Sequence, residues 1–365
     1  MSTAPDKFAP FAISTHTYKT VDGHPILLDV MIPKKLVEAG PGSAEWKVKR
    51  PILLNFHPGW LIGGQRDFQP WWSQWLIDLI IKNGAIAVSP DHRLIPEATC
   101  EDVLDDIHDS WEWVVGNLGK VVESAHRGLQ PDLSRILLAG GSAGGYCAFQ
   151  IGLTYHKSSK EVTSPDEPKP RAVIAIYPYI SIRTPHWTQA YEKNIFGIPQ
   201  LPVSMVDDHL ASIAAEREKT GKQPVLTSVP MLKPSGEFAD RALFATCAEQ
   251  HGRILELFGP ERDTTPGKRR MHPEDRIIDG RVLPPTIIVQ GSDDSISPVG
   301  GADLFVEHLR NYKAIDGWAE GKDEKEVLRY YRVPGEHLFD TELTLHGETQ
   351  DWVKDAGSFI EKSWL

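Results

Sequence analysis

The sequence has 365 residues, of which 41% are hydrophobic and 24% are charged, so it can bury a large core and differs in composition from disordered chains. Its formal net charge of −11 makes nucleic acid an unfavourable partner. No segment has the roughly 18 uninterrupted apolar residues of a membrane span, and the first ten residues do not resemble a secretory leader, so we expect a cytoplasmic protein without a membrane span.

The predicted elements begin with a hairpin, because Thr15–Pro33 alternates polar and apolar residues around the turn-forming group Val21-Asp22-Gly23-His24. Strands and helices then alternate. The predicted strands are Pro51–Phe56, Ala85–Val88, Ile136–Ala139, Ala172–Tyr177, Thr286–Val289 and Val327–Val333, and the predicted helices are Trp71–Lys82, Glu101–Leu118, Ala143–Tyr155, Ala302–Leu309 and Gln350–Lys362. This alternation implies right-handed crossovers and a mostly parallel sheet flanked by helices, which is an α/β fold.

The alternation is interrupted between residues 183 and 283, a stretch rich in Pro, Trp and charged residues with short helical patterns. We predict that residues 1–182 and 284–365 form one catalytic α/β domain. Residues 183–283 would form an inserted, mainly helical cap over the carboxyl edge of the sheet, where open α/β sheets bind ligands. The alternative is a lobe without a role in substrate binding, such as one that joins two chains in a homodimer.

The strongest local motif is Gly140-Gly141-Ser142-Ala143-Gly144-Gly145, which contains Gly-x-Ser-x-Gly between a predicted strand and a predicted helix. A nucleophilic serine needs such a sharp turn, where neighbouring glycines avoid collisions with adjacent elements. The helix start also favours negative charge that develops beside Ser142. The alternative is a glycine-rich turn that only lets a helix pack closely on a strand.

A serine nucleophile also needs a base and a group that orients the base, which in this arrangement follow in the order acid, then histidine. The strand Thr286–Val289 leads to Asp293 and Asp294, and the strand that ends at Val333 leads to His337. Both tips fall on the same edge of a parallel sheet as Ser142. His308 and His346 also follow the acidic tip, but their positions favour surface residues, so His337 is the predicted base.

The third requirement is a set of N–H groups for the oxyanion of the reaction. Ala143, the residue after the nucleophile, supplies one of them. The loop Asn55–Gly64, which follows the strand Pro51–Phe56, lies where the others are expected. The alternative is an ordinary turn between a strand and a helix.

These motifs resemble those of hormone-sensitive-lipase-like esterases with the α/β-hydrolase fold, whose members carry His-Gly-Gly-Gly, Asp-Tyr-Arg-Leu-Ala-Pro-Glu and Gly-Asp-Ser-Ala-Gly-Gly. Here the three stretches read His57-Pro58-Gly59-Trp60, Asp91-His92-Arg93-Leu94-Ile95-Pro96-Glu97 and Gly140-Gly141-Ser142-Ala143-Gly144-Gly145. The resemblance runs from about residue 15 to the end of the chain, except for the insertion.

The resemblance implies a role for individual residues. The family's acid stands fourth in a Gly-x-x-Asp turn, which favours Asp294 over Asp293. The oxyanion-hole donors would fall on Gly59 and Trp60, beside Ala143. Pro58 lacks an N–H but is not required to donate one, and the Trp60 ring would narrow the acyl side of the pocket.

The predicted activity is therefore cleavage of a carboxylic ester or lactone by a Ser142-His337-Asp294 triad through an acyl-enzyme intermediate. The substrate would be a small-molecule acyl compound of moderate size and apolar character. Amide hydrolysis, by a formamidase or peptidase, would use the same residues, as would biosynthetic acyl transfer, cyclisation or isomerisation. A non-catalytic small-molecule receptor is a further alternative, against which the presence of His337 argues.

No metal or organic cofactor is required by this chemistry. The three cysteines, Cys100, Cys147 and Cys247, are spaced too irregularly for a disulfide framework or a zinc site. We therefore expect them to be reduced.

Overall fold

The computed structural model describes residues 6–157, 161, 163–164, 166–347 and 350–365, and these form an eight-stranded sheet in the order β1-β2-β4-β3-β5-β6-β7-β8. The strands are β1 Phe11–Val21, β2 His24–Pro33, β3 Arg50–Phe56, β4 Ile86–Pro90, β5 Pro131–Gly141, β6 Pro170–Ile176, β7 Thr286–Gly291 and β8 Leu328–Val333. β2 pairs antiparallel with β1 and with β4, and all the other neighbours are parallel. The predicted mostly parallel α/β fold is confirmed.

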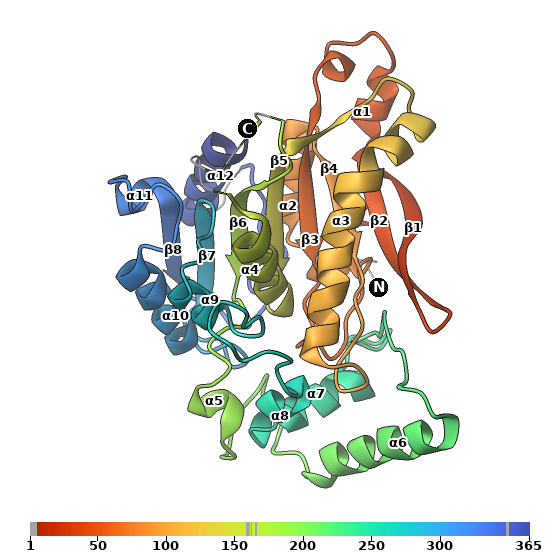
Figure 1. Cartoon of the computed structure of the whole chain (residues 1–365), viewed down its shortest axis with the longest axis vertical. Helices are drawn as coiled ribbons and strands as arrows, with labels where there is room; N and C mark the ends of the chain where they lie inside the picture. Colours follow the sequence, from red (N-terminus) through yellow and green to blue (C-terminus); the bar gives the residue numbers. More distant parts are fainter. Residues whose placement is uncertain (1–5, 158–160, 162, 165, 348–349) are drawn as a thin grey trace.

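Helices cover both faces of this sheet (Figure 1). The helices outside the insertion are α1 Lys34–Ala39, α2 Gln74–Asn83, α3 Cys100–Ala125, α4 Ala143–Tyr155, α10 Val299–Tyr312, α11 Glu324–Val327 and α12 Asp351–Trp364. Buried residues of α2 and α12 share one core cluster, and those of α3, α4 and α10 share another. The two clusters lie on opposite faces of the sheet, as right-handed crossovers require.

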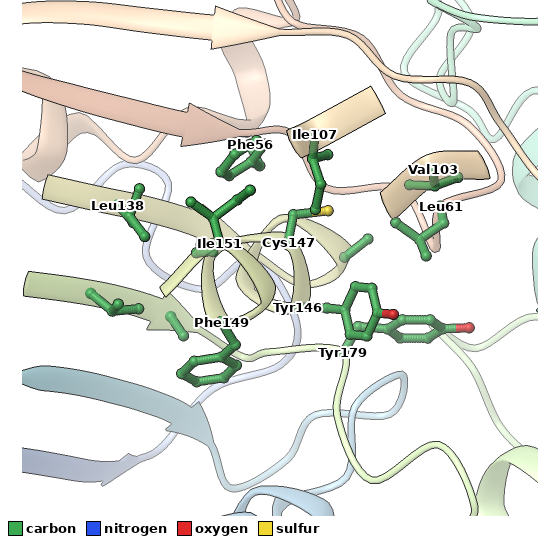
Figure 2. Close-up of a cluster of buried hydrophobic side chains, with 14 of the residues drawn as sticks. Phe56, Leu61, Val103, Ile107, Leu138, Tyr146, Cys147, Phe149, Ile151 and Tyr179 are labelled. Carbon is green, nitrogen blue, oxygen red and sulfur yellow. The ribbon is translucent and has the colours of Figure 1, made fainter. Parts of the chain in front are cut away.

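Side-chain alternation along the strands assigns residues to these two cores. In β3, Leu54 and Phe56 belong to the core beneath α3 and α4, whereas Leu53 belongs to the core beneath α2 and α12. Figure 2 shows Phe56 with Ile151 and Cys147 of α4 on the first of these faces. Because both faces are covered, the central strands read as continuous apolar runs.

Some predicted boundaries were wrong. Residues 71–73 are not part of α2, because the chain there follows a short 3₁₀ turn, Gln69–Trp71, that contains Pro70. α3 extends seven residues beyond the predicted end at Leu118. Its continuation is stabilised by burial of Val122, four residues after Leu118 on the same helical face.

The insertion between β6 and β7 contains five helices among the described residues. They are α5 Pro185–Thr188, α6 Ser204–Thr220, α7 Asp240–Gln250, α8 Ile254–Phe258 and α9 Pro273–Ile278. Figure 1 shows α5, α7 and α8 grouped at one end of the sheet, with α6 reaching beyond them. We refer to residues 183–283 as the cap, and its assignment as a separate functional unit stays a prediction.

The helices that the structure describes include none that is long and apolar enough to cross a membrane. Cys100, Cys147 and Cys247 are all buried and unpaired with one another. Burial raises the pKa of the Cys100 thiol to about 12, so this group is protonated at neutral pH.

Candidate active site

Ser142 lies at the sharp turn between β5 and α4, with φ 53° and ψ −122°. This left-handed backbone is strained for any residue other than glycine. A Cβ on Gly144 would collide with the carbonyl oxygen of Phe56, so the motif needs glycine there. Ser142 is also 1% exposed and stands at the N-terminus of α4, where free N–H groups favour negative charge.

Asp294 and His337 meet although they are 43 residues apart. The Nδ1 atom of His337 lies 2.8 Å from Oδ2 of Asp294. The other carboxylate oxygen of Asp294 accepts backbone hydrogen bonds from Ile296 at 3.0 Å and Ser297 at 2.7 Å. The carboxylate is thus fixed in orientation, and its remaining oxygen is directed at the imidazole.

Asp293 has a different environment. Its side chain is exposed and accepts a hydrogen bond from the backbone N–H of Gly335 at 3.1 Å, in the loop before His337. The backbone N–H of Asp293 in turn donates to the Gly335 carbonyl at 3.1 Å. Asp293 therefore joins two loops, and Asp294 is the residue that contacts the histidine.

The loop after β3 folds back on itself, with positive φ angles of 128° at Gly59, 58° at Trp60 and 63° at Leu61. The Gly59 carbonyl accepts hydrogen bonds from two later residues of the loop, at 2.8 and 2.9 Å. Among the residues that the structure describes, no hydrogen bond occupies the backbone N–H of Gly59 or Trp60. The N–H of Ala143, the first residue of α4, also has no partner within its helix.

The Trp60 side chain is anchored to the cap by a contact that the sequence analysis missed. Its indole Nε1 donates to Oε2 of Glu249 in α7 at 2.5 Å. The other oxygen of Glu249 lies 2.8 Å from His186 Nε2, which is also 3.0 Å from the carbonyl of Ile296 in the Asp294 loop. Burial raises the pKa of Glu249. This cluster links the cap to both loops of the site.

The Asp91–Glu97 motif also connects separate parts of the chain. Asp91 pairs with Arg66 at 2.7 Å. Glu97 binds Arg241 of α7 and lies 3.0 Å from His209 of α6. Burial alone would raise the pKa of Glu97, but the hydrogen bonds from His209 and Arg241 lower it to about 2. The motif therefore anchors the cap.

A cavity of about 180 Å³ contains both Ser142 and His337. It is lined by Pro58, Gly59, Trp60, Trp71, Ser142, Phe196, Leu232, Gly236, Phe238, Ala242, Ile296, His337 and Leu338. Most of these residues are apolar, and the cap supplies several of them. A larger cavity of about 320 Å³ lies beside the starts of β6 and β7 and is lined mainly by charged residues, far from the strand tips that carry the site.

The other histidines considered from the sequence do not line this cavity. His57 and His92 are buried and stack on each other with ring centroids 4.5 Å apart. His346 is exposed, and His308 lies on α10 with its Nδ1 2.9 Å from the carbonyl of Leu304. Among the described residues, no group of three or more His, Cys, Asp or Glu side chains is arranged to hold a metal ion.

Comparison with known proteins places this geometry in a family. A family model described as the alpha/beta hydrolase fold matches residues 53–246. Probable carboxylesterase M8 of Phoma sp. is 28% identical over 358 residues, covering 98% of this chain and 98% of that protein. Probable carboxylesterase clz11 of Cochliobolus lunatus is 28% identical over 239 residues, covering 64% of this chain and 97% of that protein.

Solved structures share the architecture. The structure of esterase LipW from Mycobacterium marinum has a TM-score of 0.52 to this chain at 16% identity, covering 97% of this chain and 80% of that one. At this identity the likeness concerns the fold. The family model spans more than half of the chain, including the Ser142 turn and the loop with Gly59, and confirms the resemblance seen in the motifs. The chain therefore belongs to the α/β-hydrolase family.

Proposed function

We propose that this chain is a serine carboxylesterase that hydrolyses small, uncharged carboxylic esters or lactones. The observation that carries the proposal is the cavity that Ser142 and His337 both line, with Asp294 2.8 Å from the imidazole Nδ1 of His337. The two related proteins named as probable carboxylesterases support the same reaction.

The proposed reaction has two acyl-transfer steps. His337 takes the hydroxyl proton of Ser142 as the serine oxygen attacks the carbonyl carbon, and Asp294 stabilises the resulting imidazolium. The N–H groups of Gly59, Trp60 and Ala143 bind the oxyanion. The imidazolium then protonates the departing alcohol. In the second step the same histidine deprotonates water, which attacks the acyl-enzyme, and the carboxylic acid leaves as the serine recovers its proton.

The lining of the cavity limits the substrate. Apart from His337, the residues around the cavity carry no ionisable side chain, so a charged acyl group would lose its hydration without a partner. The volume of about 180 Å³ is also below the roughly 300–1,000 Å³ of pockets for drug-sized ligands. Short, apolar acyl groups therefore suit the site best.

The nucleophile can be tested with a fluorophosphonate, which reacts with activated serines. We expect one adduct per chain, located on Ser142 by peptide mapping, and loss of p-nitrophenyl acetate hydrolysis in proportion to labelling. The Ser142→Ala variant, checked for native folding, should take up no label. An adduct at any other residue would refute the assignment. Comparing the acetyl ester with the matching anilide would separate esterase from amidase activity.

The role of the cap can be tested at Phe238, which lines the cavity and is partly buried. Phe238→Ala enlarges the acyl space, and room for one further methylene is worth about 1–3 kcal/mol, of which the lower end is about tenfold. We expect the ratio of kcat/KM for octanoyl over acetyl ester to rise by about tenfold. Lys219→Ala, on the exposed face of α6, should leave the ratio unchanged. An unchanged ratio in a folded Phe238→Ala variant would assign the cap a structural role.

A further inference from the structure

His337 lies in a loop after β8, so the sheet alone does not fix its ring. The bond to Asp294 holds one ring nitrogen, but a single hydrogen bond does not by itself prevent rotation of the imidazole about that contact. A catalytic base must be held within about 0.5 Å of its working position by packing and by further hydrogen bonds. The ring therefore needs a second support besides Asp294.

Tyr177 provides an aromatic surface against His337. It follows the last residue of β6 directly, with φ 38°, and its ring centroid lies 4.4 Å from that of His337 at an interplanar angle of 50°. A Cβ on Gly141, next to Ser142, would press against the Tyr177 ring. The phenol ring thus lies between Gly141, which precedes Ser142, and the imidazole of His337.

Asp340 holds the far end of this tyrosine. The Tyr177 hydroxyl donates to Oδ1 of Asp340 at 2.8 Å. The other oxygen accepts from Ser73 Oγ at 2.6 Å and from Trp75 Nε1 at 2.9 Å. Asp340 is 0% exposed and stands three residues after His337. Its carboxylate therefore connects the His337 loop with the start of α2 and the end of β6.

The hydrogen-bond partners of Asp340 are neutral donors, so a negative charge is buried one aromatic ring away from His337. Such a charge is tolerated because three hydrogen bonds satisfy the carboxylate. Burial and the neighbouring Asp340 carboxylate raise the pKa of Tyr177 well above its usual value. The phenol thus keeps its proton and donates it throughout the range in which esterases are assayed.

We propose that Tyr177 and Asp340 are positioning residues for His337, in addition to Asp294. Tyr177 limits rotation of the imidazole by contact with its face, and Asp340 fixes Tyr177 while adding a negative charge that favours the imidazolium formed in each half-reaction. This proposal rests on the proposed esterase function, because it assigns a role to the base of that mechanism.

Several charged or titratable groups surround His337. Asp294 bonds to Nδ1, and Glu336 in the same loop accepts the backbone N–H of His337 at 2.7 Å. Tyr177, directly after β6, covers one face of the imidazole, with Asp340 behind it, and the cap contributes a second aromatic ring. Removing the charge of Asp340 leaves the other two carboxylates in place. The imidazolium loses one of its stabilising charges, so its protonation requires a more acidic solution.

The test uses Tyr177→Phe, Asp340→Asn and the double variant, with kcat calculated per Ser142 site titrated by fluorophosphonate. Tyr177→Phe keeps the aromatic ring but removes the hydrogen bond to Asp340, whereas Asp340→Asn keeps the shape of the side chain but removes its negative charge. We expect kcat to fall about tenfold in each single variant and KM to change less than twofold. The double variant should be no slower than the slower single variant, because both substitutions disrupt the same contact between Tyr177 and Asp340. The acid limb of kcat/KM should move to lower pH in Asp340→Asn.

Ser73→Ala is the matched control, since it removes one hydrogen bond from the same carboxylate and leaves the charge and the tyrosine. It should lower the melting temperature without changing kcat per site or the acid limb. Unchanged kcat per site in folded Tyr177→Phe and Asp340→Asn variants, or effects that multiply in the double variant, would overturn the proposal. If Asp340→Asn does not fold, Tyr177→Phe alone decides by its kcat per site.

Failure of the esterase proposal would look different. In that case the wild type would hydrolyse no ester and take up no label, whereas the support of His337 could still be followed by NMR of ¹⁵N-labelled histidine. The His337 ring signals should titrate at lower pH in Asp340→Asn than in the wild type and should keep their wild-type titration in Ser73→Ala. Identical titration in all three proteins would overturn the positioning role by itself.

Discussion

Replacing Asp294 with asparagine is expected to lower kcat by about four orders of magnitude. The oxygen of the new amide would stay where Ile296 and Ser297 donate their N–H groups, at 3.0 and 2.7 Å in the wild type. Its NH₂ group would then face His337 and donate to Nδ1, and the hydrogen bond that Oδ2 accepts from Gln290 Nε2 at 3.1 Å in the wild type would be lost. The histidine would carry its proton on the other nitrogen, where it could not accept the proton of Ser142.

Asp293→Asn is the matched control, one residue away. The Asp293 side chain is exposed and contacts the backbone of Gly335, so its loss should reduce kcat by less than about tenfold. Both variants are compared by kcat with p-nitrophenyl acetate after thermal unfolding confirms a native fold. The reverse order of effects would move the orienting role to Asp293, and full activity in both would place the acid on another strand tip.

The residues at strand tips could be predicted because the sheet is parallel. Ser142 follows β5, Asp294 follows β7 and His337 follows β8, and the carboxyl ends of parallel strands share one edge. Only the element order and the apolar runs were needed to expect them at the same edge. The sequence could not choose between Asp293 and Asp294 without the family motif, since a one-residue step in a loop decides which side chain points inward.

Contacts that join distant segments left no signal in the sequence. Glu249 and Trp60 are 189 residues apart, and Asp340 and Ser73 are 267 residues apart. Neither pair belongs to a spacing that periodicity can detect, because helices and strands relate only near neighbours. In the cap, helices such as α5, with four residues, are too short for an amphipathic pattern, so the residues that line the cavity from this segment could not be identified.

The stability of the protein is expected to fall steeply as the pH drops from 6.5 to 4, because of the buried pair His57 and His92. Burial lowers the pKa of each imidazole from 6.5 to about 4, and for His92 the adjacent His57 adds to the effect. In this range the unfolded chain binds more protons than the folded chain, so the free energy of unfolding decreases with falling pH. The loss is roughly 3 kcal/mol per histidine at pH 4, against a typical total of about 5–15 kcal/mol.

Asparagine at these positions separates titration from packing. The ring Nδ1 of His57 lies 2.9 Å from the Pro58 carbonyl and that of His92 lies 2.7 Å from the Arg93 carbonyl, contacts that a side-chain NH₂ can replace without a titrating group. Urea unfolding between pH 4.5 and 7.5 gives the slope of unfolding free energy against pH, which is about 1.4 kcal/mol per pH unit for each proton taken up. His57→Asn and His92→Asn should each reduce this slope near pH 5 by the contribution of about one proton, about 1.4 kcal/mol per pH unit, whatever the stability of each variant at pH 7.5. If both variants keep the wild-type slope, other groups cause the acid sensitivity. His108 is one such group, because burial also lowers its pKa to about 4.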